Sequence, residues 1–144
     1  MKGVYILILK LNDDKVIQVG KLGQLKFKKG FYAYTGSALG NGGFKRVNRH
    51  FEVASGKNKV RRWHIDYILP NSEMLSAVLL PTNDALECTV AKKMGQFLNE
   101  FPGFGCTDCN CLTHLFFSEK DPEEDIVKTC RFLEIESIII NPNI

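Results

Sequence analysis

The run GVYILILK at residues 3–10 limits most strongly how this chain can fold. It joins β-branched and other apolar residues, and such a run predicts a buried strand. Further along, strand patterns alternate with helix patterns, separated by turn sequences such as LNDDK. The alternation predicts an α/β or α+β fold, with a small mixed or antiparallel sheet flanked by helices. The expected strands are 16–20, 24–30, 31–37, 74–81 and 112–118, and the expected helices are 44–56, 60–69, 83–101 and 121–134.

Apolar spacing and end signals support the expected helices. In the first long helix apolar residues recur every three or four positions, and Gly56 is a stop signal. The helix after the third long strand has an apolar stripe that consists of Leu86, Val90, Met94, Phe97 and Phe101. The last helix begins with Asp121, Pro122 and a first turn of acids, which is a strong start signal.

The chain length suits one domain. Its 144 residues are enough for a proper core and too few for two comfortable domains. We therefore expect a single domain over 1–144, with a Cys-rich loop and the C-terminal helix at 102–140. The apolar start of the chain is too short and too soon charged for a signal peptide or a membrane span. The expected location is cytoplasmic, with no membrane partner.

Positive charge is concentrated in one third of the chain. The net charge is only +3, but residues 21–64 hold eleven of the 19 Lys and Arg residues and one of the 16 acids. This asymmetry is expected of a surface that meets a polyanion, although a solvated lysine-rich face would have the same composition. The candidate nucleic-acid-binding residues are Lys45, Arg49, Lys57, Lys59, Arg61 and Arg62.

Two short triplets connect the chain to a known superfamily. Gly3-Val4-Tyr5 lies on the first strand and Tyr34-Thr35-Gly36 on a later one, and this pair resembles the signature of GIY-YIG nucleases. Arg46 then precedes His50 by one helical turn, and Glu87 lies early in a later helix, in the order that the superfamily uses. This resemblance covers about the first hundred residues.

A narrower resemblance extends over nearly the whole chain. The segments GFYAYTGSA, RVNRH, WHIDYIL and FGCTDCNCLTHLF are similar to those of a largely archaeal, uncharacterised branch of the same superfamily. Members of that branch are sometimes joined to an endonuclease III-type repair protein. The resemblance implies a GIY-YIG nuclease-like fold and a possible repair-protein partner.

The resemblance implies a metal-dependent endonuclease that hydrolyses phosphodiester bonds, with DNA as the favoured substrate. Glu87 would hold one Mg²⁺ or Mn²⁺ ion, whose other positions are filled by water and phosphate oxygens. Arg46 would stabilise charge on the phosphate, because its planar guanidinium matches phosphate oxygens. Tyr5 would act as the base if its pKa were lowered, and Tyr34 and His50 would assist it.

Each of these residues also has an ordinary explanation. Buried tyrosines are common in cores, a lone Arg on a helix is usually solvated, and acids are favoured at helix starts. A nucleic-acid-binding module without catalysis would carry the same basic face. A protein-interaction or metal-storing domain built around the Cys-rich loop is a third alternative. The set as a whole, in the right order, favours the nuclease.

Three further residues are accessory candidates. By resemblance an Asn follows the metal-binding Glu by about a dozen residues, and Asn99 stands at that place, although the nearby Pro102 follows it instead of preceding it. Asp108 or Asn110 is the alternative for that role. His64 could point toward the phosphate site or cap a polar pocket.

The cysteines leave several possibilities open. Three of the five cluster as Cys106-x2-Cys109-x-Cys111, close before His114, and Cys88 adjoins Glu87. A Zn²⁺ site from Cys88, Cys109, Cys111 and His114 is chemically reasonable, although the spacing is cramped. Free thiols, or a disulfide from Cys88 to Cys109 or Cys111, are the alternatives. Cys130 is expected in the core.

Overall fold

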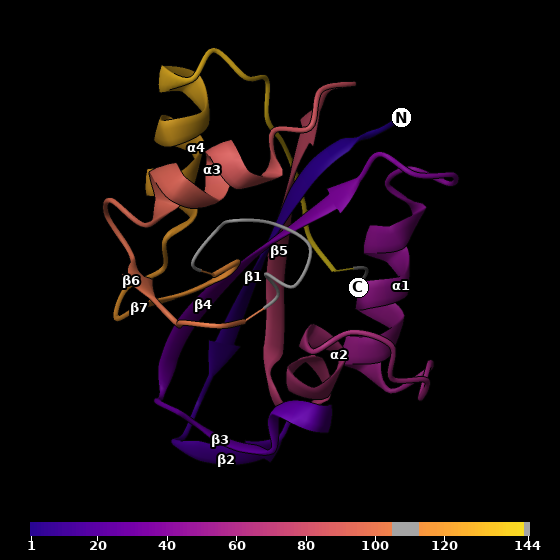
Figure 1. Ribbon diagram of the computed structural model, residues 1–144, viewed down its shortest axis with the longest axis vertical. Helices are drawn as coiled ribbons and strands as arrows, with labels where there is room; N and C mark the ends of the chain where they lie inside the picture. Colours follow the sequence, from indigo (N-terminus) through magenta and orange to yellow (C-terminus); the bar gives the residue numbers. More distant parts are fainter. Residues whose placement is uncertain (105–112, 143–144) are drawn as a thin grey trace.

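The computed structural model describes residues 1–104 and 113–142, which build one six-stranded sheet and a separate two-stranded hairpin (Figure 1). The strand order is β6-β7-β4-β1-β5-β8, and every neighbouring pair is antiparallel. Four α-helices flank this sheet in the described part, which confirms the expected α+β class. The sheet strands are β1 Gly3–Leu11, β4 Gly30–Ala38, β5 Glu73–Pro81, β6 Asn99–Glu100, β7 Leu115–Ser118 and β8 Ile138–Ile140.

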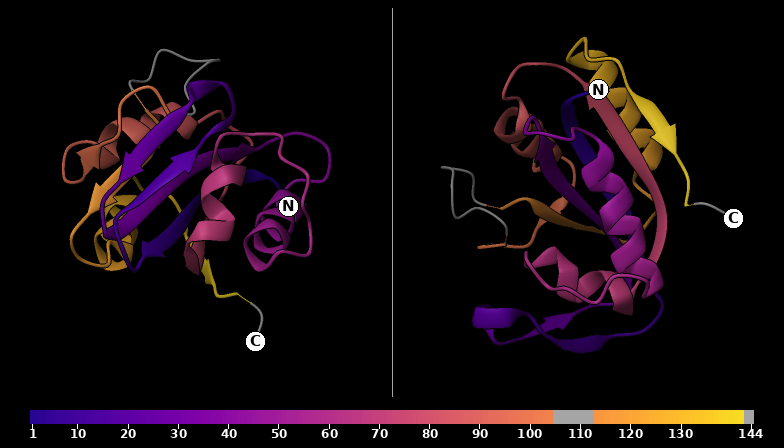
Figure 2. Two further views of the ribbon diagram at one scale, coloured as in Figure 1. Left: turned by 90° about the horizontal axis from the view of Figure 1, so that it is seen from below. Right: turned by 90° about the vertical axis from the view of Figure 1, so that its right-hand side faces the viewer.

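The central strand β1 divides the core into two halves, because successive side chains of a strand point to opposite faces. Val4, Ile6 and Ile8 face the helices α3 (Glu87–Met94) and α4 (Glu123–Phe132). Tyr5 and Leu7 face the other way, toward α1 (Lys45–Ser55) and α2 (Ile65–Ile68). Residues 4–9 are continuously apolar for this reason: both faces of the strand are covered (Figures 1 and 2).

Short elements complete the fold. The strands β2 (Lys15–Gln18) and β3 (Gln24–Phe27) pair as a hairpin next to α2, with the 3-10 turn η1 (Gly20–Leu22) between them. A second 3-10 turn, η2 (Leu69–Asn71), follows α2 directly. Gly56 ends α1 in the left-handed conformation, with φ of 85°, as its position in the sequence predicts. In the described part of the chain, no helix is long and apolar enough to span a bilayer.

The helix expected at 83–101 is wrong over its second half. The α-helix ends at Met94, and Asn99 and Glu100 form an edge strand paired with β7. Phe97, expected in the apolar stripe, is 39% exposed. Phe101 instead stacks on Phe27 of the hairpin at 5.0 Å between ring centroids. Tertiary contacts therefore override the helical periodicity after Met94.

Candidate functional site

The strands β1 and β4 bring the two triplets of the sequence side by side. Their register places Tyr5 directly opposite Gly36. A Cβ atom at Gly36 would overlap the Tyr5 ring, so glycine is required for the ring to lie across the β4 backbone. Tyr34 belongs to the same half of the core as Tyr5. The two triplets thus place the Tyr5 ring close to the β4 backbone at Gly36.

Substituting Gly36→Ala is expected to lower the free energy of unfolding by about 1–3 kcal/mol, because the new methyl group overpacks against the Tyr5 ring. Gly40→Ala is the matched control, since a Cβ there has no neighbour within 4 Å. Urea unfolding of both variants measures the difference. Equal stability of the two variants would contradict this account of Gly36.

Helix α1 brings two more of the predicted residues to this place. His50 Nε2 lies 2.8 Å from the Tyr5 hydroxyl oxygen, across 45 positions of the sequence. One turn earlier, Arg46 donates from Nη1 to the carbonyl oxygen of Ser37 at 2.7 Å. Ser37 directly follows Gly36, so the same stretch of β4 accommodates Tyr5 and orients Arg46.

Glu87 reaches the cluster from the other helical layer. It is the first residue of α3, and this helix is fixed to β4 by the bond from Thr35 Oγ1 to Met94 Sδ at 3.2 Å. The Glu87 carboxylate oxygen Oε2 lies 3.3 Å from His114 Nδ1, and the His114 carbonyl accepts the Thr35 amide at 2.9 Å. Burial is the main cause of the raised pKa of both Tyr5 and Tyr34, and the negative charge of Glu87 raises both further.

The structure therefore brings together the five residues predicted as the catalytic set. Residues 34–37 of β4 are the shared support. Tyr5 and Arg46 contact this stretch, His50 is linked to it through Tyr5, and Glu87 acts electrostatically on Tyr34. The set comprises Tyr5, Tyr34, Arg46, His50 and Glu87. We call it the β4 cluster.

Burial controls the protonation states in the β4 cluster. Burial first, and then the neighbouring Tyr34, raise the pKa of Tyr5 well above its ordinary value, while the charge of Arg46 lowers it. Burial likewise raises the pKa of Tyr34. Burial lowers the pKa of His50 from 6.5 to about 4, so its imidazole is neutral at pH 7. The raised pKa of Tyr5 differs from the lowered value that a base at neutral pH requires.

The hydrogen-bond partners of His50 indicate its tautomer. Its Nδ1 is buried and has no hydrogen-bond partner among the described residues. A buried N–H without a partner is rarer and more costly than an unpaired acceptor. The proton is therefore assigned to Nε2, which donates to the Tyr5 oxygen. In this arrangement His50 would stabilise a phenolate at Tyr5, and the Tyr5 hydroxyl proton is left for another partner.

Acidification from pH 6.5 to pH 4 is expected to destabilise the protein through His50. The unfolded chain takes up a proton near pH 6.5, whereas folded His50 takes it up near pH 4, so stability falls as the pH falls through this window. The loss amounts to about 3 kcal/mol. Urea unfolding at a series of pH values should show a flatter slope for His50→Gln than for the wild type. His114, whose pKa burial also lowers, adds a slope of the same sign in both proteins.

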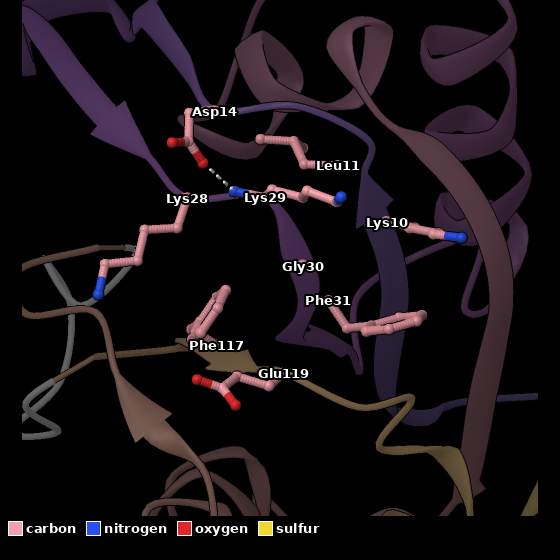
Figure 3. Close-up of a pocket in the computed structure, with 9 residues that line it drawn as sticks. All are labelled: Lys10, Leu11, Asp14, Lys28, Lys29, Gly30, Phe31, Phe117 and Glu119. Carbon is pink, nitrogen blue, oxygen red and sulfur yellow. Dashed lines mark hydrogen bonds between the residues drawn. The ribbon is translucent and has the colours of Figure 1, made fainter.

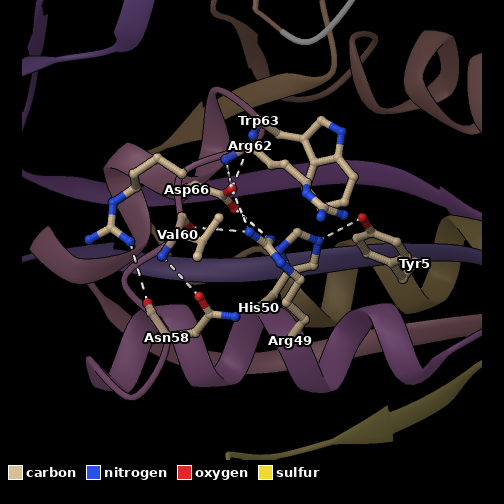
Figure 4. A network of polar contacts seen from close by, with 9 residues as sticks. Tyr5, Arg49, His50, Asn58, Val60, Arg62, Trp63 and Asp66 are labelled. Carbon is tan, nitrogen blue, oxygen red and sulfur yellow. Dashed lines mark hydrogen bonds and ion pairs between the residues drawn. The ribbon is translucent and has the colours of Figure 1, made fainter.

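A second polar network lies beside the β4 cluster (Figure 4). Asp66 is fully buried and binds Arg49 through two parallel hydrogen bonds of 3.0 Å. It also accepts the backbone amides of Arg62 at 2.6 Å and Trp63 at 3.0 Å. Arg49, expected to bind nucleic acid, thus already has a carboxylate partner, and a phosphate would compete with Asp66 for it.

The other predicted binding residues differ in their surroundings. Lys45, Lys57, Lys59 and Arg62 are exposed, whereas Arg61 is half-buried and donates to the Asn58 carbonyl oxygen. His64 packs edge-on against Phe104, with 5.8 Å between ring centroids. Asn99 is exposed on the edge strand β6, and we find no contact between it and the β4 cluster in the described part. Asp108, Cys109 and Cys111 lie outside the described residues, as do Cys106 and Asn110.

The metal donors in the described part are few. Over residues 1–104 and 113–142, no group of three or more His, Cys, Asp or Glu side chains is placed to hold a metal ion. The Glu87 side chain is 26% exposed and offers one carboxylate, which fits Mg²⁺ or Mn²⁺, since such ions keep several water ligands. The expected zinc site depends on Cys109 and Cys111, so it lies outside the described residues. Cys130 is a buried free thiol, as expected.

A recess of about 440 Å³ lies at the opposite end of β1 and β4 (Figure 3). Lys10, Lys28 and Lys29 line it together with Phe31 and Phe117. Its Gly30 wall is six positions from Gly36 along β4, roughly 20 Å at the rise of a strand. The recess holds no residue of the β4 cluster, and Asp14 and Glu119 in its lining offset part of the charge of the three lysines.

Sequence reasoning missed Asp66 and Trp63 as parts of the site. The guanidinium groups of Arg46 and Arg49 both lie over the Trp63 ring. Their Cζ atoms are 5.0 Å (Arg46) and 4.8 Å (Arg49) from the ring centroid. A signal was present in the sequence. Asp66 is an acid that follows the most basic third of the chain and stands among apolar residues, so it is buried and needs a cationic partner.

Comparison with known proteins gives a family. A search of the curated proteins and a search of the solved structures found no match. The model of the family described as "Domain of unknown function DUF123" matches residues 4–135, which include the whole β4 cluster and most of the chain. The chain therefore belongs to the family Domain of unknown function DUF123.

Proposed function

We propose that this protein is a metal-dependent endonuclease of the GIY-YIG type, which hydrolyses phosphodiester bonds in nucleic acid, with DNA favoured. The observation that carries the proposal is the convergence of the β4 cluster. Its members come from two strands and two helices. Tyr5 and Arg46 contact residues 34–37, His50 bonds to Tyr5, and the charge of Glu87 acts on Tyr34. A cytoplasmic role in DNA repair with a repair-protein partner is part of the same proposal.

The chemistry of the cluster matches what hydrolysis of a phosphodiester needs. Arg46 presents a guanidinium that is already oriented by the Ser37 carbonyl, so it can stabilise charge that develops on the phosphate. Tyr5 is the candidate to accept a proton from the attacking water. The bond from His50 Nε2 and the charge of Arg46 both favour the phenolate form that this role requires.

Glu87 is the residue that would hold a divalent ion. Its carboxylate is partly exposed, and its charge already acts on Tyr5 and Tyr34. A bound Mg²⁺ or Mn²⁺ would supply charge neutralisation to the phosphate. His114 lies beside the carboxylate and would orient it, as neighbours of metal ligands commonly do.

A non-catalytic nucleic-acid-binding module is the second candidate, and one observation favours it. Burial raises the pKa of Tyr5 well above its ordinary value, which opposes formation of the phenolate. Such a module would use the exposed Lys45, Lys57, Lys59 and Arg62 to bind phosphates. Such a module would not need the Glu87 carboxylate, because binding of phosphates requires no divalent ion at that residue.

Parallel cleavage and binding assays separate the two candidates. Wild type, Glu87→Gln and the control Glu124→Gln are incubated with supercoiled plasmid and Mg²⁺ at low salt, and gel shifts are measured alongside. Glu124 forms an exposed ion pair with Lys128 on α4, so its loss should change nothing. We expect nicking by the wild type and Glu124→Gln, at least about a hundredfold less by Glu87→Gln, and DNA binding by all three. Equal nicking by Glu87→Gln would contradict the role of Glu87, and binding without any nicking would favour the module.

A further inference from the structure

Asp66 is the anchor of the network beside the β4 cluster. Its carboxylate is fully buried, yet four hydrogen bonds satisfy it: two from Arg49 and one each from the amides of Arg62 and Trp63. These bonds tie the start of α2 to the middle of α1. The Arg49 guanidinium donates in addition to the Val60 carbonyl at 3.2 Å. The backbone at 60–63 is therefore held against α1 at several points (Figure 4).

Trp63 connects the Asp66 network to Arg46. Arg46 and Arg49 are three residues apart on α1, so their like charges are neighbours on one helix face. Asp66 compensates the charge of Arg49, and the indole ring of Trp63 attracts both guanidinium groups, at 5.0 and 4.8 Å from its centroid. Trp63 also lies next to His50, with 6.0 Å between ring centroids.

Arg46 is consequently held from two sides. The Ser37 carbonyl accepts from its Nη1 on the β4 side, and the Trp63 ring supports it on the α2 side. An arginine side chain loses considerable rotational freedom when it is fixed in this way, and a group that is fixed before the reaction avoids that cost at the moment of reaction.

We infer that Asp66 and Trp63 are positioning residues for Arg46, acting through Arg49 and through the indole ring. The role in a reaction rests on the proposed function, because Arg46 is there the group that stabilises the phosphate. The positioning itself is a property of the folded chain and is measurable without any substrate.

The test uses the full chain and two pairs of variants. Trp63→Phe keeps an aromatic ring for the guanidinium groups and Trp63→Leu does not, while Asp66→Asn removes the negative charge and Glu124→Gln removes an exposed carboxylate elsewhere. The NMR order parameter of the Arg46 Nε–Hε group reports its rigidity directly. Far-UV circular dichroism and urea unfolding establish that each variant is folded under the conditions used.

The expected result is a rigid Arg46 in wild type, Trp63→Phe and Glu124→Gln, and a mobile one in Trp63→Leu and Asp66→Asn. With supercoiled plasmid and Mg²⁺, kcat should fall between about tenfold and a hundredfold in the two variants with mobile Arg46, with a smaller change in KM. The Trp63→Phe variant should keep most of the rate that Trp63→Leu loses. If Asp66→Asn does not fold, the Trp63 pair alone decides.

Three results would count against the inference, wholly or in its catalytic part. An Arg46 that stays rigid in folded Trp63→Leu shows that the indole does not position it. Equal loss of DNA binding in Trp63→Phe and Trp63→Leu, with Arg46 rigid in both, would make Trp63 a contact for nucleic acid instead. Nicking at the wild-type rate with a mobile Arg46 would remove the catalytic part of the inference. A loss of Arg46 order together with no nicking by the wild type would sustain the positioning and reject the proposed function.

Discussion

Replacing Arg46 with lysine is expected to slow nicking of plasmid DNA by about a hundredfold or more. Removal of one stabilising donor from such a site costs that much in rate. Lysine keeps the positive charge but loses the planar fork, and it has no flat face to lie over Trp63. Gel shifts should change little, because the exposed lysines supply most of the affinity for phosphates.

The matched control for this substitution is Arg131→Lys. Arg131 is an exposed arginine in the last turn of α4, in the helical layer on the other face of the sheet. It should nick DNA at the wild-type rate. If Arg46→Lys and Arg131→Lys both nick at the wild-type rate, the contacts of Arg46 are structural only and the proposed role in the reaction is wrong.

The second large effect concerns stability. Asp66→Ala is expected to lower the free energy of unfolding by about 3–5 kcal/mol, because it leaves Arg49, whose side chain is only 18% exposed, without its carboxylate partner. The two backbone amides of Arg62 and Trp63 also lose their acceptor. Urea unfolding at pH 7 measures this loss. The exposed pair of Glu124 and Lys128 is the control, and Glu124→Gln should cost less than about 1 kcal/mol.

The pH dependence of Asp66 gives the sign of its contribution. Burial alone would raise the pKa of Asp66, but the hydrogen bonds from Arg49 and from the amides of Trp63 and Arg62 outweigh burial and lower it. The stabilisation is therefore complete above the unfolded value of about 4 and is lost as the pH falls through the lower folded pKa. The difference in stability between wild type and Asp66→Ala should shrink below about pH 4. A difference that stays constant down to pH 2 would contradict the ion pair as its source.

Local signals in the sequence predict much of the fold. The apolar run at 4–9 predicts a buried strand, and this strand lies in the middle of the sheet with helices on both faces. Gly56 and the acids after Pro122 mark helix ends correctly, because capping and dipole effects act within one turn. Tertiary contacts decide where local signals fail. Asn99 and Glu100 pair with β7, and Ile138–Ile140 forms an edge strand that the sequence pattern did not predict.

For the candidate site too, local signals identify some residues and tertiary contacts decide the others. The residues of the two triplets, Arg46, His50 and Glu87 are identifiable in sequence, because their order and spacing resemble a known signature. The apolar residues around Asp66 indicate a buried acid that needs a cationic partner. That this partner is Arg49, and that Trp63 lies against both arginines, is not visible in the sequence, because these contacts form only when α2 folds back onto α1. The protonation of Tyr5 is also invisible in the sequence. It depends on burial and on charges contributed by Arg46, Glu87 and Asp66 from three different elements.

We propose that the β4 cluster cleaves nucleic acid with the help of a divalent ion. Its most direct test follows the conversion of supercoiled plasmid to nicked circles by the wild-type protein in Mg²⁺, after chelation, and after Mg²⁺ is restored. Branched DNA and structured RNA are tested in the same three conditions. We expect cleavage of at least one substrate, which chelation abolishes and Mg²⁺ restores. Cleavage that persists unchanged in chelator, or the absence of cleavage on all three substrates, would contradict it.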